Sequence, residues 1–408
     1  MVALEPGLTR DSRDTIRMLA LLGAFFFVAS VVGYLATMSW GTAIPRDGTS
    51  LVVGRDFLNF WMYGRAAFTA DPSRFYDLAE YHRALDALLG SGYPGQNWSY
   101  PPSIFFLAAP FGQLGYLPAL LVWTVLGLAL FVAVARSHFG DNRLLVALVL
   151  SPAAVLCVIS GQSSLITAAM LVTIFSVLDR SPVMAGVLVG LLTLKPQLGI
   201  LLPVMLIASG RWRVFVSAAA TAIVIAGATA LVFGPQVWID FITKGLAANG
   251  LVLADPERIA TPFYPTVFMN LRGLDLPYGL AMAVQLCFSA FAIAAVFWAY
   301  RFRRDADPQW LMALFLACAV CGVPYLLSYD TLALTFAALL LLAGGRLEPA
   351  GQRFVQLVYW LPLIQIGLGN LHVPGPALIA PAFAVYALMR LRASPASTSF
   401  DATCITAR

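Results

Sequence analysis

Residues 183–197 have the sequence VMAGVLVGLLTLKPQ, and a second apolar run, Leu198 to Ile207, follows at once. Lys195 is the single charge in this stretch. A lysine at bilayer depth costs about 2.5–3.5 kcal/mol on insertion scales, so it normally faces a water-filled cavity or a bound anion. Pro196 breaks the helix directly after the lysine. The stretch predicts a discontinuous membrane helix beside a polar site, where other polar motifs should meet Lys195.

The whole chain has the composition of an all-α polytopic membrane protein, with 60% hydrophobic and 11% charged residues. We expect roughly twelve transmembrane or half-spanning helices, and several of them are shorter than the ~20 residues that a perpendicular span needs. The apolar runs are Met18–Met38, Leu117–Ala135, Leu144–Ile159, Leu165–Leu178, Val183–Leu194, Leu198–Ala208, Val214–Phe233, Tyr278–Tyr300, Trp310–Leu326, Thr331–Ala343, Phe354–Gly369 and Pro374–Met389. Short spans predict pairs of helices that meet at a cavity. We interpret Ser103–Gly115 as a re-entrant or half-length helix, residues 1–393 as one membrane-embedded domain, and 394–408 as a disordered cytoplasmic tail.

Short arginine-containing segments flank many of these runs and predict the orientation of the chain. The arginines are Arg10, Arg13, Arg17, Arg136, Arg143, Arg180, Arg211, Arg213, Arg301, Arg303, Arg304, Arg346, Arg353, Arg390 and Arg392. The positive-inside rule places them in the cytoplasm, together with both termini. Two larger outer segments, residues 40–102 and 234–277, then lie on the opposite side with Lys195. The net charge of +5 follows mainly from these arginines, so no nucleic-acid partner is implied.

The first outer segment mixes aromatic and charged residues from Arg55 to Phe68, a pattern typical of a helix that lies in the membrane interface. Asp56 stands where this helix would begin. An aspartate at that position often caps a helix by accepting hydrogen bonds from its free amides. The residues alone leave open whether Asp56 is such a cap or a functional carboxylate.

A series of short motifs resembles glycosyltransferase family 87. The motifs are Asp56-Phe57-x-x-Phe60-Trp61, Arg65-Ala66, Asp71-Pro72, Tyr76-Asp77, Tyr100-Pro101-Pro102, Gly161-Gln162, Leu194-Lys195-Pro196 and Tyr329-Asp330. This family includes polyprenol-phosphate-mannose-dependent mannosyltransferases that act on phosphatidylinositol mannosides. One departure is the spacer Ser73-Arg74-Phe75, where the family pattern suggests a tighter turn.

The resemblance implies a C-type glycosyltransferase fold with an outer interfacial helical segment and an active site on the outer face of a bacterial cytoplasmic membrane. It implies that Asp56 is the catalytic base, which takes the proton of an acceptor hydroxyl in a single inverting displacement. Lys195 would neutralise the leaving polyprenyl phosphate. The alternative for Lys195 is a structural pair with an aspartate such as Asp330.

Further candidates for substrate or phosphate binding are His372, Gln162, Tyr100, Arg65 and Arg258. Each also has an ordinary interpretation: His372 as an interfacial histidine, Gln162 as the cap of a turn, and Arg258 as a solvated loop charge. We expect Tyr100 and Gln162 near the wall of the cavity. No set of histidines, cysteines and carboxylates suggests a metal, and no cofactor is expected.

The sequence therefore favours a membrane glycosyltransferase, most closely a mannosyltransferase, with a polyprenyl-phosphate-sugar donor and a lipid or glycan acceptor as its partners. The main alternative is a transporter or flippase whose intramembrane lysine binds an anionic substrate. Such proteins often contain inverted repeats, and none is visible here. A second alternative is a noncatalytic subunit of an envelope complex, in which Asp56 and Lys195 would be dispensable.

Overall fold

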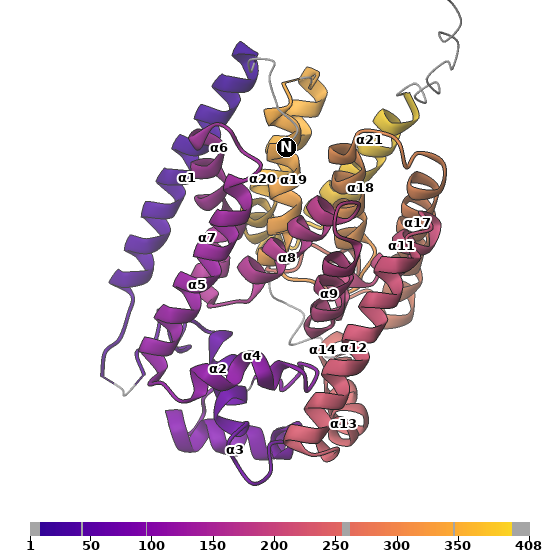
Figure 1. Cartoon of the computed structure of the whole chain (residues 1–408). Coiled ribbons are helices and arrows are strands. Elements are labelled where there is room, and N and C mark those ends of the chain that lie inside the picture. Colours follow the sequence, from indigo (N-terminus) through magenta and orange to yellow (C-terminus); the bar gives the residue numbers. More distant parts are fainter. Residues whose placement is uncertain (1–8, 42–43, 95, 255–261, 346, 394–408) are drawn as a thin grey trace, which may run out of the picture.

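The computed structural model describes residues 9–41, 44–94, 96–254, 262–345 and 347–393 (Figure 1). Within these residues the chain is helical, and extended pairing is limited to two isolated bridges that involve Ser39, Arg46 and Val52. Most helices form a bundle, and the short helices α2, α3 and α4 lie across its lower end as drawn in Figure 1. The all-α class expected from the composition is therefore confirmed.

Five described helical segments are long and apolar enough to cross a membrane, and a bent pair makes a possible sixth. The long segments are α1 (Arg10–Ala36), α5 (Tyr116–Arg136), α12 (Trp212–Phe233), α17 (Tyr278–Phe302) and Gly375–Ala393, which combines η5 (Gly375–Leu378) and α21 (Ile379–Ala393). The bent pair is α6 (Asn142–Val149) and α7 (Pro152–Ser160), with 49° between them. The other apolar runs lie in helices that are shorter or, for Phe354–Gly369, less apolar, so the total of roughly twelve spanning or half-spanning helices stays a prediction.

The remaining helices of the bundle differ in burial. They are α8 (Ser164–Val177), α9 (Pro182–Leu191), η2 (Leu192–Leu194), α10 (Pro196–Gly199), α11 (Leu202–Ala208), α18 (Pro308–Cys321), η4 (Ser328–Thr331), α19 (Leu332–Ala343) and α20 (Pro349–Gly369). α18 is buried without interruption from Leu311 to Cys321, and α19 from Leu332 to Leu342. Helices that are apolar on every side belong in the centre of a bundle. At 1.5 Å per residue each is about 20 Å long, well short of the ~30 Å hydrocarbon core, so an end of each lies at membrane depth.

The peripheral helices α1 and α12 have the opposite character. Their exposed side chains are large and apolar, with Phe25 73% and Leu231 88% exposed. Contiguous apolar surface of this kind marks contact with a membrane. The start of α1 and the end of α21 lie at the end of the molecule opposite α2, α3 and α4 (Figure 1).

The first outer segment folds around an aromatic core of its own. It contains α2 (Phe57–Ala66), η1 (Arg74–Tyr76) and α3 (Leu78–Leu89), and α4 (Ile104–Gly112), which follows the segment, packs against α2. The rings of Tyr63 and Trp98 stack with centroids 3.6 Å apart at its centre. α2 and α4 touch through glycines, since a Cβ on Gly112 would lie 2.0 Å from the carbonyl carbon of Gly64. α4 has nine residues, a length compatible with the re-entrant or half-length helix predicted for Ser103–Gly115, and how it meets the membrane stays a prediction.

The second outer segment joins the same end of the molecule. It contains α13 (Gln236–Asp240), the π-helical turn η3 (Phe241–Gly245), α14 (Leu246–Ala254) and α16 (Val267–Arg272). The Ser73 hydroxyl donates a hydrogen bond of 2.6 Å to Asp240 Oδ2 and so links the two outer segments. The predicted tail, residues 394–408, lies outside the described residues.

Candidate active site

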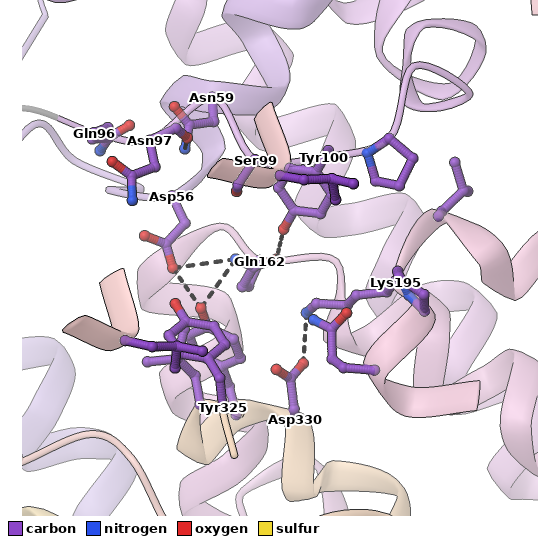
Figure 2. A pocket seen from close by; sticks show the side chains of 18 of the residues that line it. Asp56, Asn59, Gln96, Asn97, Ser99, Tyr100, Gln162, Lys195, Tyr325 and Asp330 are labelled. Carbon is purple, nitrogen blue, oxygen red and sulfur yellow. Dashed lines mark hydrogen bonds and ion pairs between the residues drawn. The ribbon is translucent and has the colours of Figure 1, made fainter. Parts of the chain in front are cut away.

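A cavity of about 600 Å³ lies where the outer segments meet the broken helices of the bundle. Figure 2 shows that its polar side chains come from segments far apart in the sequence. The lining residues are Asp56, Asn59, Gln96, Asn97, Ser99, Tyr100, Pro101, Gln162, Leu194, Lys195, Pro196, Gln197, Phe241, Leu246, Leu253, Tyr264, Tyr325, Leu327, Tyr329 and Asp330. The cavity therefore contains Asp56, Tyr100, Gln162 and Lys195 together.

Asp56 immediately precedes α2, but its carboxylate makes no capping hydrogen bond. Its Oδ2 instead accepts hydrogen bonds from the Tyr329 hydroxyl at 2.8 Å and from Gln162 Nε2 at 3.3 Å (Figure 2). Burial raises the pKa of the Asp56 carboxyl above its ordinary value, and these two hydrogen bonds act in the opposite direction. The interpretation of Asp56 as a side-chain helix cap is therefore wrong, because the carboxylate points into the cavity.

Gly161 allows Asp56 and Gln162 to come together. It adopts the left-handed conformation, with φ of 60°, at the end of α7. A Cβ at this position would lie 2.6 Å from the Cβ of Phe57 and 2.9 Å from the carbonyl oxygen of Gly54. Without a side chain the two segments approach closely enough for the Asp56 amide to donate to the Ser160 carbonyl at 3.0 Å. The close approach and the left-handed backbone explain why a glycine precedes Gln162.

The side chain of Gln162 connects several parts of the wall. Its Oε1 accepts from the backbone amide of Ser163 at 2.8 Å and from the hydroxyl of Tyr100 at 3.1 Å. Its Nε2 donates to the hydroxyl of Tyr329 at 3.0 Å as well as to Asp56. Gln162 therefore caps its turn, as one of the two interpretations proposed, and also organises the polar wall of the cavity.

Lys195 lies at a helix break between η2 and α10, as the sequence predicts. Its Nζ is 2.6 Å from Asp330 Oδ1 and 3.3 Å from the Ser164 hydroxyl. The side chains of Lys195 and Asp330 are only 5% and 2% exposed. The pairing with Asp330 considered as an alternative role is thus present in the structure, and any ligand of Lys195 has to share it with that carboxylate.

Two other candidates, Arg65 and His372, do not line this cavity. Arg65 is exposed and stacks its guanidinium on Trp61, 4.8 Å from the ring centroid. His372 is exposed and its Nδ1 lies 3.2 Å from the Gly273 carbonyl oxygen. Each side chain instead contacts a residue that does not line the cavity, Trp61 for Arg65 and Gly273 for His372. Arg258 lies outside the described residues.

Sequence reasoning assigned no role to Tyr329 and considered Asp330 only as a possible partner of Lys195. Both belong to η4, the turn that precedes the buried helix α19. Tyr329 contacts both ends of the site, since its hydroxyl bonds Asp56 and its ring lies 5.3 Å from Lys195 Nζ. The available signal was a polar pair between two apolar runs, the same signal that identified Lys195.

The lining residues carry little net charge. Asp56, Asp330 and Lys195 are the lining residues with ionisable acid or base side chains, apart from the tyrosines. The helices α8 and α19 both begin at this cavity, and a helix N-terminus contributes a partial positive charge. Within the described part of the chain no group of three or more histidines, cysteines and carboxylates has the arrangement of a metal site.

The family model of Glycosyltransferase family 87 matches residues 98–329, which is more than half of the 408-residue chain. The chain therefore belongs to this family. The matched region contains Tyr100, Gln162, Lys195 and Tyr329, whereas Asp56 precedes it. No curated protein and no solved structure is significantly similar to the chain.

Proposed function

We propose that this family 87 glycosyltransferase moves a sugar, mannose, from a polyprenyl-phosphate donor to a hydroxyl of a lipid or glycan acceptor, with inversion at the anomeric carbon. The observation that carries the proposal is that Asp56 and Lys195 line one cavity although they lie far apart in the sequence. A cavity of about 600 Å³ is within the usual range of small-molecule sites. Membership of a glycosyltransferase family disfavours the two alternatives, a transporter or flippase and a noncatalytic subunit.

In the proposed reaction Asp56 acts as the general base. The acceptor oxygen forms a bond to the anomeric carbon, and its proton passes to the Asp56 carboxylate. The bond between the anomeric carbon and the phosphate oxygen breaks, and polyprenyl phosphate leaves with the bonding electrons. Support comes from Asp56 itself, whose raised pKa favours proton acceptance and whose Oδ1 has no hydrogen bond within the described part of the chain.

The donor phosphate is proposed to bind beside Lys195. The lysine is already compensated by Asp330, so a phosphate would draw the ammonium partly away from that carboxylate. The N-termini of α8 and α19 add favourable dipoles at the same place. Phe241, Leu246 and Leu253 of the second outer segment offer apolar surface to the first isoprene units.

Direct transfer tests this function. Purified protein is incubated with radiolabelled polyprenyl-phosphate mannose and membrane lipids, and the lipids are analysed for a labelled product. We expect a product that retains the label after the donor is destroyed by mild acid. Absence of transfer from every polyprenyl-phosphate sugar tried, to lipid and glycan acceptors alike, would contradict the proposal.

We also propose that residues 1–393 form one domain of the bacterial cytoplasmic membrane, with both termini inside and the cavity outside. Cysteine labelling in intact cells tests this orientation, in a variant whose five native cysteines are replaced. A reagent that cannot cross the membrane should label a cysteine introduced near Asp71 and should not label one near Asp305. The reverse pattern would overturn the orientation.

A further inference from the structure

The hydrogen bonds around Asp56 have a defined direction. The backbone amide of Ser163 can only donate, so the atom of Gln162 that it contacts at 2.8 Å is the oxygen Oε1. The other terminal atom is then the nitrogen Nε2, which donates to Tyr329 and to Asp56. Because the Tyr329 hydroxyl has one proton and already accepts from Gln162, it donates that proton to Asp56 Oδ2.

From this directed network we infer that Tyr329 is the positioning residue of the proposed base, holding Asp56 through Oδ2 so that Oδ1 faces the acceptor hydroxyl. The inference rests on the proposed function and extends it by assigning a role to Tyr329. Both hydrogen bonds that the described residues make to the carboxylate converge on Oδ2. The second oxygen therefore remains available for the proton transferred in the reaction.

Tyr329 is suited to this task because it is itself held firmly. It is 5% exposed and lies in η4 between Ser328 and Asp330. The Ser328 amide donates to the Phe263 carbonyl at 2.8 Å, and Asp330 pairs with Lys195. Asp56 belongs to the first outer segment and Tyr329 to the bundle, so their hydrogen bond also links these two parts of the molecule.

The network favours the ionised carboxylate. A donor that bonds a carboxylate lowers the pKa of that group, since the bond is stronger to the charged form. Loss of the Tyr329 hydroxyl therefore raises the pKa of Asp56 further above its ordinary value. A base is active above its pKa, and its activity is lost as the pH falls through that value. The acidic limb of the kcat/KM profile should thus move to higher pH when this donor is removed.

The test compares Tyr329→Phe with Tyr116→Phe. Tyr116 is a matched control because its buried hydroxyl donates to the Val53 carbonyl at 2.7 Å and the residue does not line the cavity. For Tyr329→Phe we expect the acidic limb of kcat/KM for sugar transfer to shift upward by about one pH unit, as expected for one hydrogen bond to a charged group. Tyr116→Phe should keep the wild-type limb.

A double-mutant cycle separates positioning from a general structural effect. If Tyr329 acts through Asp56, adding Tyr329→Phe to Asp56→Asn should lower the residual transfer rate less than twofold, because the group that Tyr329 positions is already gone. An unshifted limb in a folded Tyr329→Phe protein, or full additivity in the cycle, would overturn the inference. Failure of the proposed function is distinguishable, since the wild-type protein would then transfer no sugar at all.

Discussion

The two ends of the cavity place carboxylates in different surroundings. Asp56 is half-buried, and its hydrogen-bond donors, Tyr329 and Gln162, are neutral. Asp330 is almost fully buried and contacts a full positive charge, the Lys195 ammonium at 2.6 Å. Both aspartates line the cavity, but among the described residues Asp330 pairs directly with a cation whereas Asp56 has neutral partners.

This difference indicates how each group can be used. A buried ion pair is stable only while both partners remain, since removal of one leaves an uncompensated charge and costs about 3–5 kcal/mol. A carboxylate held by neutral donors can take up a proton without breaking an ion pair. Asp56 is accordingly suited to proton transfer, whereas the first effect expected from changes at Lys195 or Asp330 is on stability.

Asp56→Asn should have the largest effect on turnover, and it tests whether Asp56 is the general base. The amide keeps the size of the side chain but cannot accept the proton of the acceptor. We expect turnover to fall by about 10²–10⁴-fold, the usual worth of a positioned general base. The thermal midpoint in detergent should stay close to wild type, because no ion pair is broken. A purified Asp56→Asn protein that transfers sugar at the wild-type rate would contradict the role of Asp56.

The variants Lys195→Met and Asp330→Asn test the buried ion pair. Each leaves one partner of the buried pair, so the free energy of unfolding should fall by about 3–5 kcal/mol, measured by denaturation in detergent. The double variant Lys195→Met/Asp330→Leu removes both charges and should recover most of this loss.

Activity of the double variant then separates two roles of Lys195. If Lys195 binds the donor phosphate, the double variant should be stable but have a KM for the donor raised at least tenfold. Recovery of both stability and wild-type kinetics would show that the ion pair is structural and would contradict the proposed binding of the donor phosphate by Lys195. The single variants cannot decide this, because their instability alone lowers activity.

The sequence predicted the polar residues of the site better than it predicted their partners. Lys195 stood out because a charge at membrane depth is costly. Asp56 was singled out by its motif, because the residues alone also allowed an ordinary helix cap. The helix break at Pro196 was also predictable, because proline cannot continue a helix. The hydrogen bonds of Gln162 and Tyr329 were not, because they depend on how α2, α7 and η4 pack, which no local pattern specifies.

Two surface candidates, Arg65 and His372, lie away from this cavity. Arg65 lies in a motif of the first outer segment, yet it falls on the exposed side of α2 and packs on Trp61. His372 was a candidate for substrate or phosphate binding on the predicted outer side of the membrane. Sidedness restricts a residue to one half of the molecule but does not bring it to a particular cavity.

Arg65→Ala and His372→Asn should therefore have the smallest effects. Loss of an exposed stacking interaction between Arg65 and Trp61 is worth about 0.5–1 kcal/mol of stability. Asparagine at position 372 tolerates the left-handed backbone that His372 adopts, with φ of 53°. Neither side chain lines the cavity, so the donor KM of each variant should stay within about twofold of wild type, because surface changes away from a site alter free energies by about 0.5 kcal/mol or less. A tenfold rise in the donor KM for Arg65→Ala would show that the phosphate reaches the outer surface of α2, and the comparison would then have to include a third charged group.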